Sequence, residues 1–165
     1  MISTESNVGK TTILLALKEV MDPELPFLSV VDLGIIGDID IHENRVLLKI
    51  LPTFTACPAI QLMREQIIEK ILSLGFYGAE VEVDYSIPWN SDRISEEGKK
   101  KLEKFGLATA DTHQGNFSID DIEQSKCPHC SSCNTTMNSI FGSTLCRSMH
   151  YCFDCRQGFE RFKPL

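Results

Sequence analysis

The chain has 165 residues, of which 42% are hydrophobic and 24% charged, so its composition is that of a globular protein and not of a disordered one. Sixteen Lys and Arg against 23 Asp and Glu give a net charge of -7, which argues against a basic surface for nucleic acid. The sequence has no run of 18 apolar residues, so no membrane span is predicted. Residues 1–12 also lack the pattern of a secretory signal, and we therefore expect a cytoplasmic protein.

The first predicted element is a helix that ends near Asp22. Pro23 and Pro26 follow it and cannot continue a helix. In the proline-containing loop DPELPFLSVVDLG, Asp22 and Glu24 stand two residues apart. Capping of backbone N–H groups and oxygen ligation of a metal are both open for these carboxylates. The apolar residues at helical spacing in the helix are Ile13, Leu14, Leu17, Val20 and Met21.

A β-hairpin, a helix and a further strand are predicted next. Residues 34–43 alternate apolar and acidic side chains, residues 45–52 are mostly apolar, and Asn44 suits the turn between them. A helix then begins at Pro58 and ends at Gly75, and residues 79–87 form a strand that returns parallel to the strand before the helix. The expected body is therefore of the α+β class, with a small mixed sheet packed by helices.

A third predicted helix is capped by Ser95 and stops at Gly106, and the polar, acidic segment 107–126 follows it. Six of the seven cysteines lie in the last 39 residues. We therefore predict three parts: a body over 1–106, an acidic linker over 107–126 and a zinc ribbon over 127–165.

The last part contains two C-x-x-C motifs, CPHC and CFDC, which are separated by 21 residues. In a reducing compartment this spacing is typical of a structural zinc site, because each tight turn supplies two thiolates to a tetrahedral metal. Other nearby thiols and imidazoles, at Cys133, Cys146, His129 and His150, leave the ligand set open, and four thiolates also hold iron or an iron-sulfur cluster. The predicted metal ligands are Cys127, Cys130, Cys152 and Cys155.

Cys57 precedes Pro58 at the predicted start of the second helix. A thiol at a helix N-terminus lies near backbone N–H donors and the positive end of the helix dipole, so we expect a lowered pKa and a reactive thiolate. The alternative is a small buried apolar side chain. No histidine is placed beside this thiol by the sequence, so no nucleophile and base pair is predicted.

Together the segments DPELPFLSVVDLG, PTFTACPA, PWNSDRISEEGKKKLEKFG, CPHC, FGSTLC and CFDCRQGFERFKPL resemble the PaaD (or PaaJ) subunits of bacterial phenylacetyl-CoA epoxidase systems. The resemblance runs from about Leu14 to Phe162, and the body by itself is similar to the wider SufT-like family of metal-sulfur cluster biosynthesis. Cys133 departs from the pattern of relatives, which leaves an alternative ligand set open.

The resemblance implies an accessory subunit of aerobic phenylacetate breakdown that is non-catalytic by itself and helps to assemble or insert an iron-sulfur or di-iron cofactor. It implies a reactive or metal-transferring role for Cys57, with Asp22 and Glu24 as the acidic motif, and ribbon thiolates around a structural zinc. A transient iron or iron-sulfur cluster, the other oxygenase subunits and iron-sulfur assembly proteins are the implied cofactor and partners, with no membrane or nucleic acid. Two alternatives stay open: a structural subunit that transfers no metal, and a zinc-ribbon protein that binds nucleic acid.

Overall fold

The computed structural model describes residues 3–55, 57–114, 116 and 118–164. The chain forms two compact units, Met1–Pro88 and Trp89–Leu165, each of which has its own sheet. Among the described residues, no helix has the length and apolar character that a membrane span requires.

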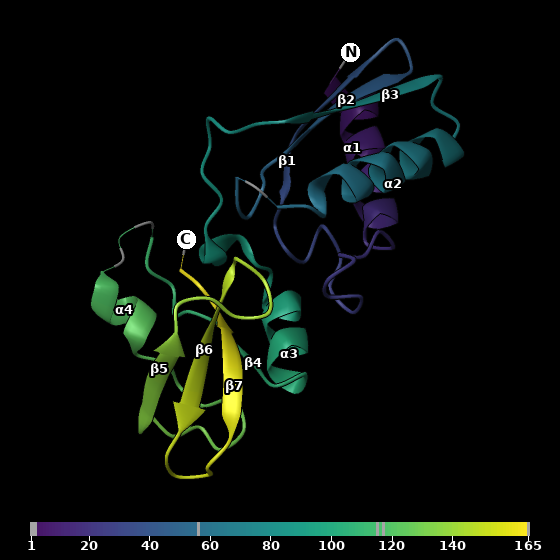
Figure 1. Ribbon diagram of the computed structural model, residues 1–165. Helices are drawn as coiled ribbons and strands as arrows, with labels where there is room; N and C mark the ends of the chain where they lie inside the picture. Colours follow the sequence, from purple (N-terminus) through teal and green to yellow (C-terminus); the bar gives the residue numbers. More distant parts are fainter. Residues whose placement is uncertain (1–2, 56, 115, 117, 165) are drawn as a thin grey trace. The chain divides into compact units, whose positions relative to one another are not determined.

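The first unit is a three-stranded sheet with two helices on one face (Figure 1). Strands β1 and β2 are antiparallel neighbours, and β3 pairs parallel to β2 after the crossover through α2. This is the predicted hairpin plus parallel strand, so the predicted α+β class is confirmed. The elements are α1 (Ser3–Leu17), β1 (Ile36–His42), β2 (Arg45–Ile50), α2 (Ile60–Ser73) and β3 (Gly78–Val83).

Local sequence explains the hairpin and its buried face. Glu43 and Asn44 both have positive φ, 47° and 63°, as a two-residue turn between twisted strands requires. Along β2 the apolar side chains of Val46, Leu48 and Ile50 are buried at every second position. The core of this unit also contains the buried side of α2, formed by Met63, Ile67 and Ile71.

The end of α1 and the start of α2 differ from the prediction, whereas the glycine stop of α2 agrees with it. Helix α1 ends at Leu17, before Val20, although the apolar spacing continues. The backbone of Val20 instead accepts a hydrogen bond from Val30 N–H at 2.9 Å, so pairing within the loop replaces the last helical turn. Helix α2 begins at Ile60, two residues after Pro58, and Gly75 follows its end with φ +94°.

The second unit contains a four-stranded sheet in the order β4-β7-β6-β5. β4 is parallel to β7, and the other pairs are antiparallel. Figure 1 shows the three ribbon strands side by side, with α3 next to the short β4. The elements are the 3-10 helix η1 (Ser91–Arg93), α3 (Glu96–Lys104), β4 (Leu107–Ala108), α4 (Ile119–Glu123), β5 (Thr135–Ser139), β6 (Arg147–Cys152) and β7 (Gly158–Phe162).

The predicted boundary at residue 106 and the predicted linker 107–126 fall inside this second unit. Part of the linker is strand β4, which adds an edge to the ribbon sheet. Another part is α4, where the backbone carbonyl of Ile122 accepts a hydrogen bond from Arg161 Nη1 at 3.1 Å. Trp89 is also buried here and packs on Phe162, with ring centroids 6.2 Å apart. The ribbon strands have few apolar residues of their own, so the preceding segment completes their core.

Candidate functional site

The two C-x-x-C turns of the second unit bring four thiols together. We call Cys127–Cys130 the first knuckle and Cys152–Cys155 the second knuckle. The Sγ atoms of Cys127 and Cys155 are 3.6 Å apart, as are those of Cys130 and Cys152, and all four lie within 4.8 Å of one another. These distances exceed a disulfide bond, and all four cysteines are free.

Each knuckle is closed by the same backbone turn. Cys127 N–H donates to the carbonyl of Ser132 at 2.9 Å, and Cys152 N–H donates to the carbonyl of Gln157 at the same distance. The residue directly after each knuckle has a left-handed backbone. The φ angle is 63° at Ser131, after the first knuckle, and 59° at Arg156, after the second. The turns therefore point both thiols of each knuckle to one place.

The thiols differ in burial and in acidity. Cys127 and Cys152 are 1% and 0% exposed and form a small core cluster with Ala108 and Phe159, whereas Cys130 is exposed. Backbone hydrogen bonds from Cys155 and Asp154 lower the pKa of Cys152 to about 7, while desolvation and the neighbouring thiols raise the pKa of Cys155 to about 12. A bound cation would stabilise all four as thiolates.

The geometry fits a tetrahedral metal. Four sulfurs at about 2.3 Å from a zinc ion stand about 3.8 Å from one another, close to the observed 3.6 Å pairs. Within the described part of the chain, neither Cys133 nor Cys146 belongs to the group. His150 is buried instead with its Nε2 at 2.8 Å from Ser148 Oγ and its ring stacked on Phe159.

Cys57 lies at the start of α2, where the hairpin chain turns into the helix. Its thiol is half-buried and receives backbone hydrogen bonds from Ala59 and Ile60. Burial raises the pKa of this thiol, and the negative charges of Glu24 and Asp22 raise it further, more than the two amides lower it. The prediction of a lowered pKa is therefore wrong, because it considered the helix end without the desolvation and the acidic loop.

The acidic loop confirms a capping use for Asp22. Its Oδ1 accepts hydrogen bonds from the backbone N–H groups of Glu24 at 2.6 Å and Leu25 at 3.0 Å, and the side chain is buried. Asp32 has a similar role: its backbone N–H donates to Ser29 Oγ at 3.0 Å, and its carboxylate accepts from Ser29 N–H. Glu24 is exposed, so its carboxylate faces solvent near Cys57.

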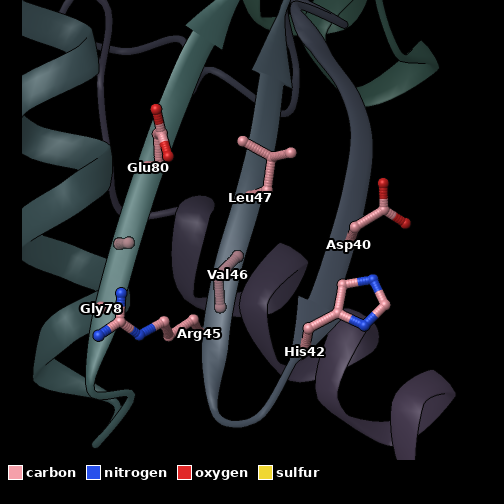
Figure 2. Close-up of a pocket in the computed structure, with 8 residues that line it drawn as sticks. Asp40, His42, Arg45, Val46, Leu47, Gly78 and Glu80 are labelled. Atoms are coloured by element: carbon pink, nitrogen blue, oxygen red, sulfur yellow. The ribbon is translucent and has the colours of Figure 1, made fainter.

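A hollow of about 250 Å³ on the open face of the first sheet was not predicted (Figure 2). In cross-strand register, Asp40, Leu47 and Glu80 form one row, and Arg45 extends along the neighbouring row over Gly78. The sequence contains no local signal for this hollow, because its lining residues come from three strands and only the register of the sheet brings them together. Its lining carries both signs of charge, which does not select one class of ligand.

Two protein families match different parts of the chain. Residues 10–83 match the family described as iron-sulfur cluster assembly protein. Residues 111–163 match the PaaD zinc beta ribbon domain, which includes both knuckles. The two matches fall in the first and second compact units respectively.

Individual relatives agree with these matches. The chain is 34% identical over 89 residues to "Fe-S protein maturation auxiliary factor" of Porphyromonas gingivalis, covering 52% of this chain and 83% of that protein. It is 29% identical over 147 residues to a putative 1,2-phenylacetyl-CoA epoxidase subunit of Escherichia coli K12, covering 89% and 88% of the two chains.

A solved structure has the same fold as part of the chain. It is a domain of unknown function, DUF59, from Bacillus anthracis, with a TM-score of 0.56 and 26% identity, covering 61% of this chain and 96% of that one. The chain therefore belongs to the iron-sulfur cluster assembly protein family, in a form that carries a PaaD zinc beta ribbon domain after the assembly domain.

Proposed function

We propose that this protein is a non-catalytic accessory subunit of a phenylacetyl-CoA epoxidase, and that it assembles or inserts the iron-sulfur or di-iron cofactor of that enzyme. One observation carries the proposal: a single chain joins an assembly-family unit with a thiol beside two carboxylates to a ribbon with four gathered thiols. The names of the relatives from Porphyromonas gingivalis and Escherichia coli support the two halves of this proposal.

The role proposed for Cys57 follows from its surroundings. The raised pKa keeps the thiol protonated at neutral pH, so it is a poor nucleophile in the absence of a cation. The approach of a metal cation or a cluster iron reverses this balance, because the cation favours the thiolate and is attracted by Asp22 and Glu24. The site is thus suited to hold a metal cargo transiently, with Cys57 as the sulfur ligand and Glu24 as the exposed carboxylate.

The role proposed for the ribbon is structural. Cys127, Cys130, Cys152 and Cys155 leave no open coordination position on a tetrahedral zinc ion, which suits stability and not catalysis. We propose zinc as the resident metal, and the ribbon as the module that docks on other epoxidase subunits or on iron-sulfur assembly proteins. We place this activity in the cytoplasm, where thiols stay reduced.

The test replaces Cys57 in cells that depend on this protein for epoxidase activity. We expect Cys57→Ser to lower epoxidase activity and the iron content of the purified enzyme at least about tenfold, since removal of a group that only supports a metal ligand already costs that much. Cys133→Ser is the matched control, since Cys133 is an exposed thiol outside the four-thiol group and should leave both values unchanged.

Two further measurements, co-purification and the iron content of epoxidase from cells without the protein, separate a second candidate function. The Escherichia coli relative is named as part of the epoxidase itself, which favours a protein that stays in the complex and transfers nothing. In that case the protein would co-purify with the epoxidase at a fixed ratio, and cells without it would still produce enzyme with its full iron content. Full activity of the Cys57→Ser protein would remove this thiol from the mechanism.

A further inference from the structure

Asp154, the third residue of the second knuckle, reaches across to the chain that follows the first knuckle. Its Oδ2 accepts a hydrogen bond from Ser132 Oγ at 2.5 Å, and its Oδ1 accepts one from Asn134 Nδ2 at 2.7 Å. The backbone joins the same two segments, because Phe153 N–H donates to the carbonyl of Asn134 at 3.0 Å. The second knuckle is thus tied to residues 132–134 by three hydrogen bonds.

Both ends of this bridge are also hydrogen-bonded directly to a cysteine of a knuckle. Ser132 supplies the carbonyl that accepts from Cys127 N–H and closes the first knuckle, and its Oγ also accepts from Asn134 N–H at 2.9 Å. On the other side, the backbone N–H of Asp154 is hydrogen-bonded to the thiol of Cys152. The corresponding third residue of the first knuckle is His129, so the first knuckle has no carboxylate at the position of Asp154.

Electrostatics does not explain a carboxylate at this position. A zinc ion with four thiolates has a net charge of about -2, so a further negative charge nearby disfavours the loaded site. The partners of Asp154 are a neutral hydroxyl and a neutral amide, so no cation compensates for that charge in these contacts. The contribution of Asp154 is therefore geometric: it holds the two knuckles together.

We propose that Asp154 is a positioning residue that keeps the two knuckles at the spacing a tetrahedral metal requires and thereby raises the affinity of the four-thiol site. The inference rests on the structural metal proposed for the ribbon. In the bridged protein the four sulfurs already lie within 4.8 Å of one another. Metal binding therefore restricts the two turns little further. Without the bridge, binding must also restrict the two turns relative to each other, which lowers the affinity.

The first experiment measures zinc affinity of the full-length protein by competition with a chromophoric chelator. Asp154→Ala should weaken zinc binding about 10- to 100-fold, the range found when groups supporting metal ligands are removed. Asp120→Ala is the matched control: Asp120 is an exposed carboxylate on α4 of the same unit, and it should bind zinc as tightly as the unchanged protein.

A double-mutant cycle tests whether Asp154 acts through Ser132. We expect Ser132→Ala to weaken zinc binding in the same direction, and the double variant to be no weaker than Asp154→Ala alone, because both remove the same bridge. Circular dichroism at saturating zinc should match that of the unchanged protein, which separates positioning from general unfolding. Asn134→Ala removes one of the two side-chain bonds and should give an intermediate affinity even if Asp154→Ala does not fold.

Three results would overturn the proposal. Zinc affinity of Asp154→Ala within about twofold of the unchanged protein would show that the bridge does not support the metal, as would full additivity in the cycle. In both cases the zinc ribbon itself would stand. Failure of the unchanged protein to bind zinc at all would overturn the bridge and the proposed structural metal together.

Discussion

At the scale of single residues, the acidic loop and the burial of Cys57 control how readily this thiol ionises. The backbone amides of Ala59 and Ile60 lower the pKa of the thiol, as expected at the start of a helix. Desolvation raises the pKa by more than the amides lower it. The thiol is therefore mostly protonated at neutral pH, and the charges of Glu24 and Asp22 disfavour its thiolate further.

This balance predicts the alkylation behaviour of Cys57. Because Glu24 raises the pKa of the thiol, Glu24→Gln should lower that pKa and increase the thiolate fraction at pH 7. The rate of alkylation by iodoacetamide should rise roughly two- to fivefold, a change typical of one nearby surface charge. Peptide mass spectrometry over a pH series gives the rate at Cys57, and the increase should shrink as the pH rises above the pKa.

The control for this prediction is Glu69→Gln. Glu69 is exposed on the same helix α2, at the end far from Cys57 in sequence, so its removal should not change the rate. Equal alkylation of the Glu24→Gln and unchanged proteins at every pH would show that the charge of Glu24 does not act on the thiol.

At the scale of elements, the loop between β5 and β6 is fixed by the carboxylate of Glu160 on β7. This carboxylate accepts hydrogen bonds from the backbone and hydroxyl of Ser143, the latter at 3.0 Å, and pairs with Arg147 Nη1 at 2.7 Å. The Arg147 side chain is only 8% exposed, so the pair is largely shielded from water. A Cβ on Gly142 would stand 2.6 Å from the same carboxylate, so a larger residue there requires the Glu160 side chain to shift.

We predict that Glu160→Ala destabilises the second unit by about 2 to 4 kcal/mol. The change leaves the buried Arg147 guanidinium without its charged partner and removes the hydrogen bonds to Ser143. Urea unfolding of the zinc-loaded protein measures the loss. Glu123→Ala, at the exposed end of α4, should change the free energy of unfolding by less than about 0.5 kcal/mol. Similar curves for the two variants would contradict the role of Glu160.

At the scale of the whole molecule, the ribbon is part of a larger unit that begins at Trp89. β4 pairs with β7 along Leu107 and Ala108, and Ala108 packs on the buried thiols Cys127 and Cys152. Ala108, which lies between the residues that match the two sequence families, therefore belongs to the core around the four thiols.

This organisation predicts where the chain can be cut. A fragment of residues 89–165 should bind about one zinc ion and unfold in one cooperative transition, because it keeps β4, α3 and both knuckles. A fragment of residues 127–165 lacks β4 and should show no cooperative transition, although it has all four ligands. Calorimetry with zinc analysis compares the two, and equal melting behaviour would place the boundary at residue 127.

The features that the sequence alone predicted correctly depend on neighbours in the chain. The Glu43–Asn44 turn, the alternation along β2 and the apolar stripe of α2 are local patterns, and the hairpin and helix they predict are present. The C-x-x-C spacing likewise places two thiols on one tight turn, and the predicted four cysteines lie together. Short-range geometry dictates the hairpin, the helix and each two-thiol turn, whereas the meeting of the two turns is a long-range contact that the spacing of a zinc site predicts.

Long-range contacts decided the rest. The early end of α1 depends on the pairing of Val20 with Val30, and the raised pKa of Cys57 depends on burial and on the loop of Asp22. The assignment of residues 89–126 to the ribbon unit depends on the pairing of β4 with β7, and the bridge of Asp154 depends on the meeting of two knuckles. In each case the partner is distant in sequence or the effect arises from desolvation, and only the folded chain determines which groups meet and how much water they lose.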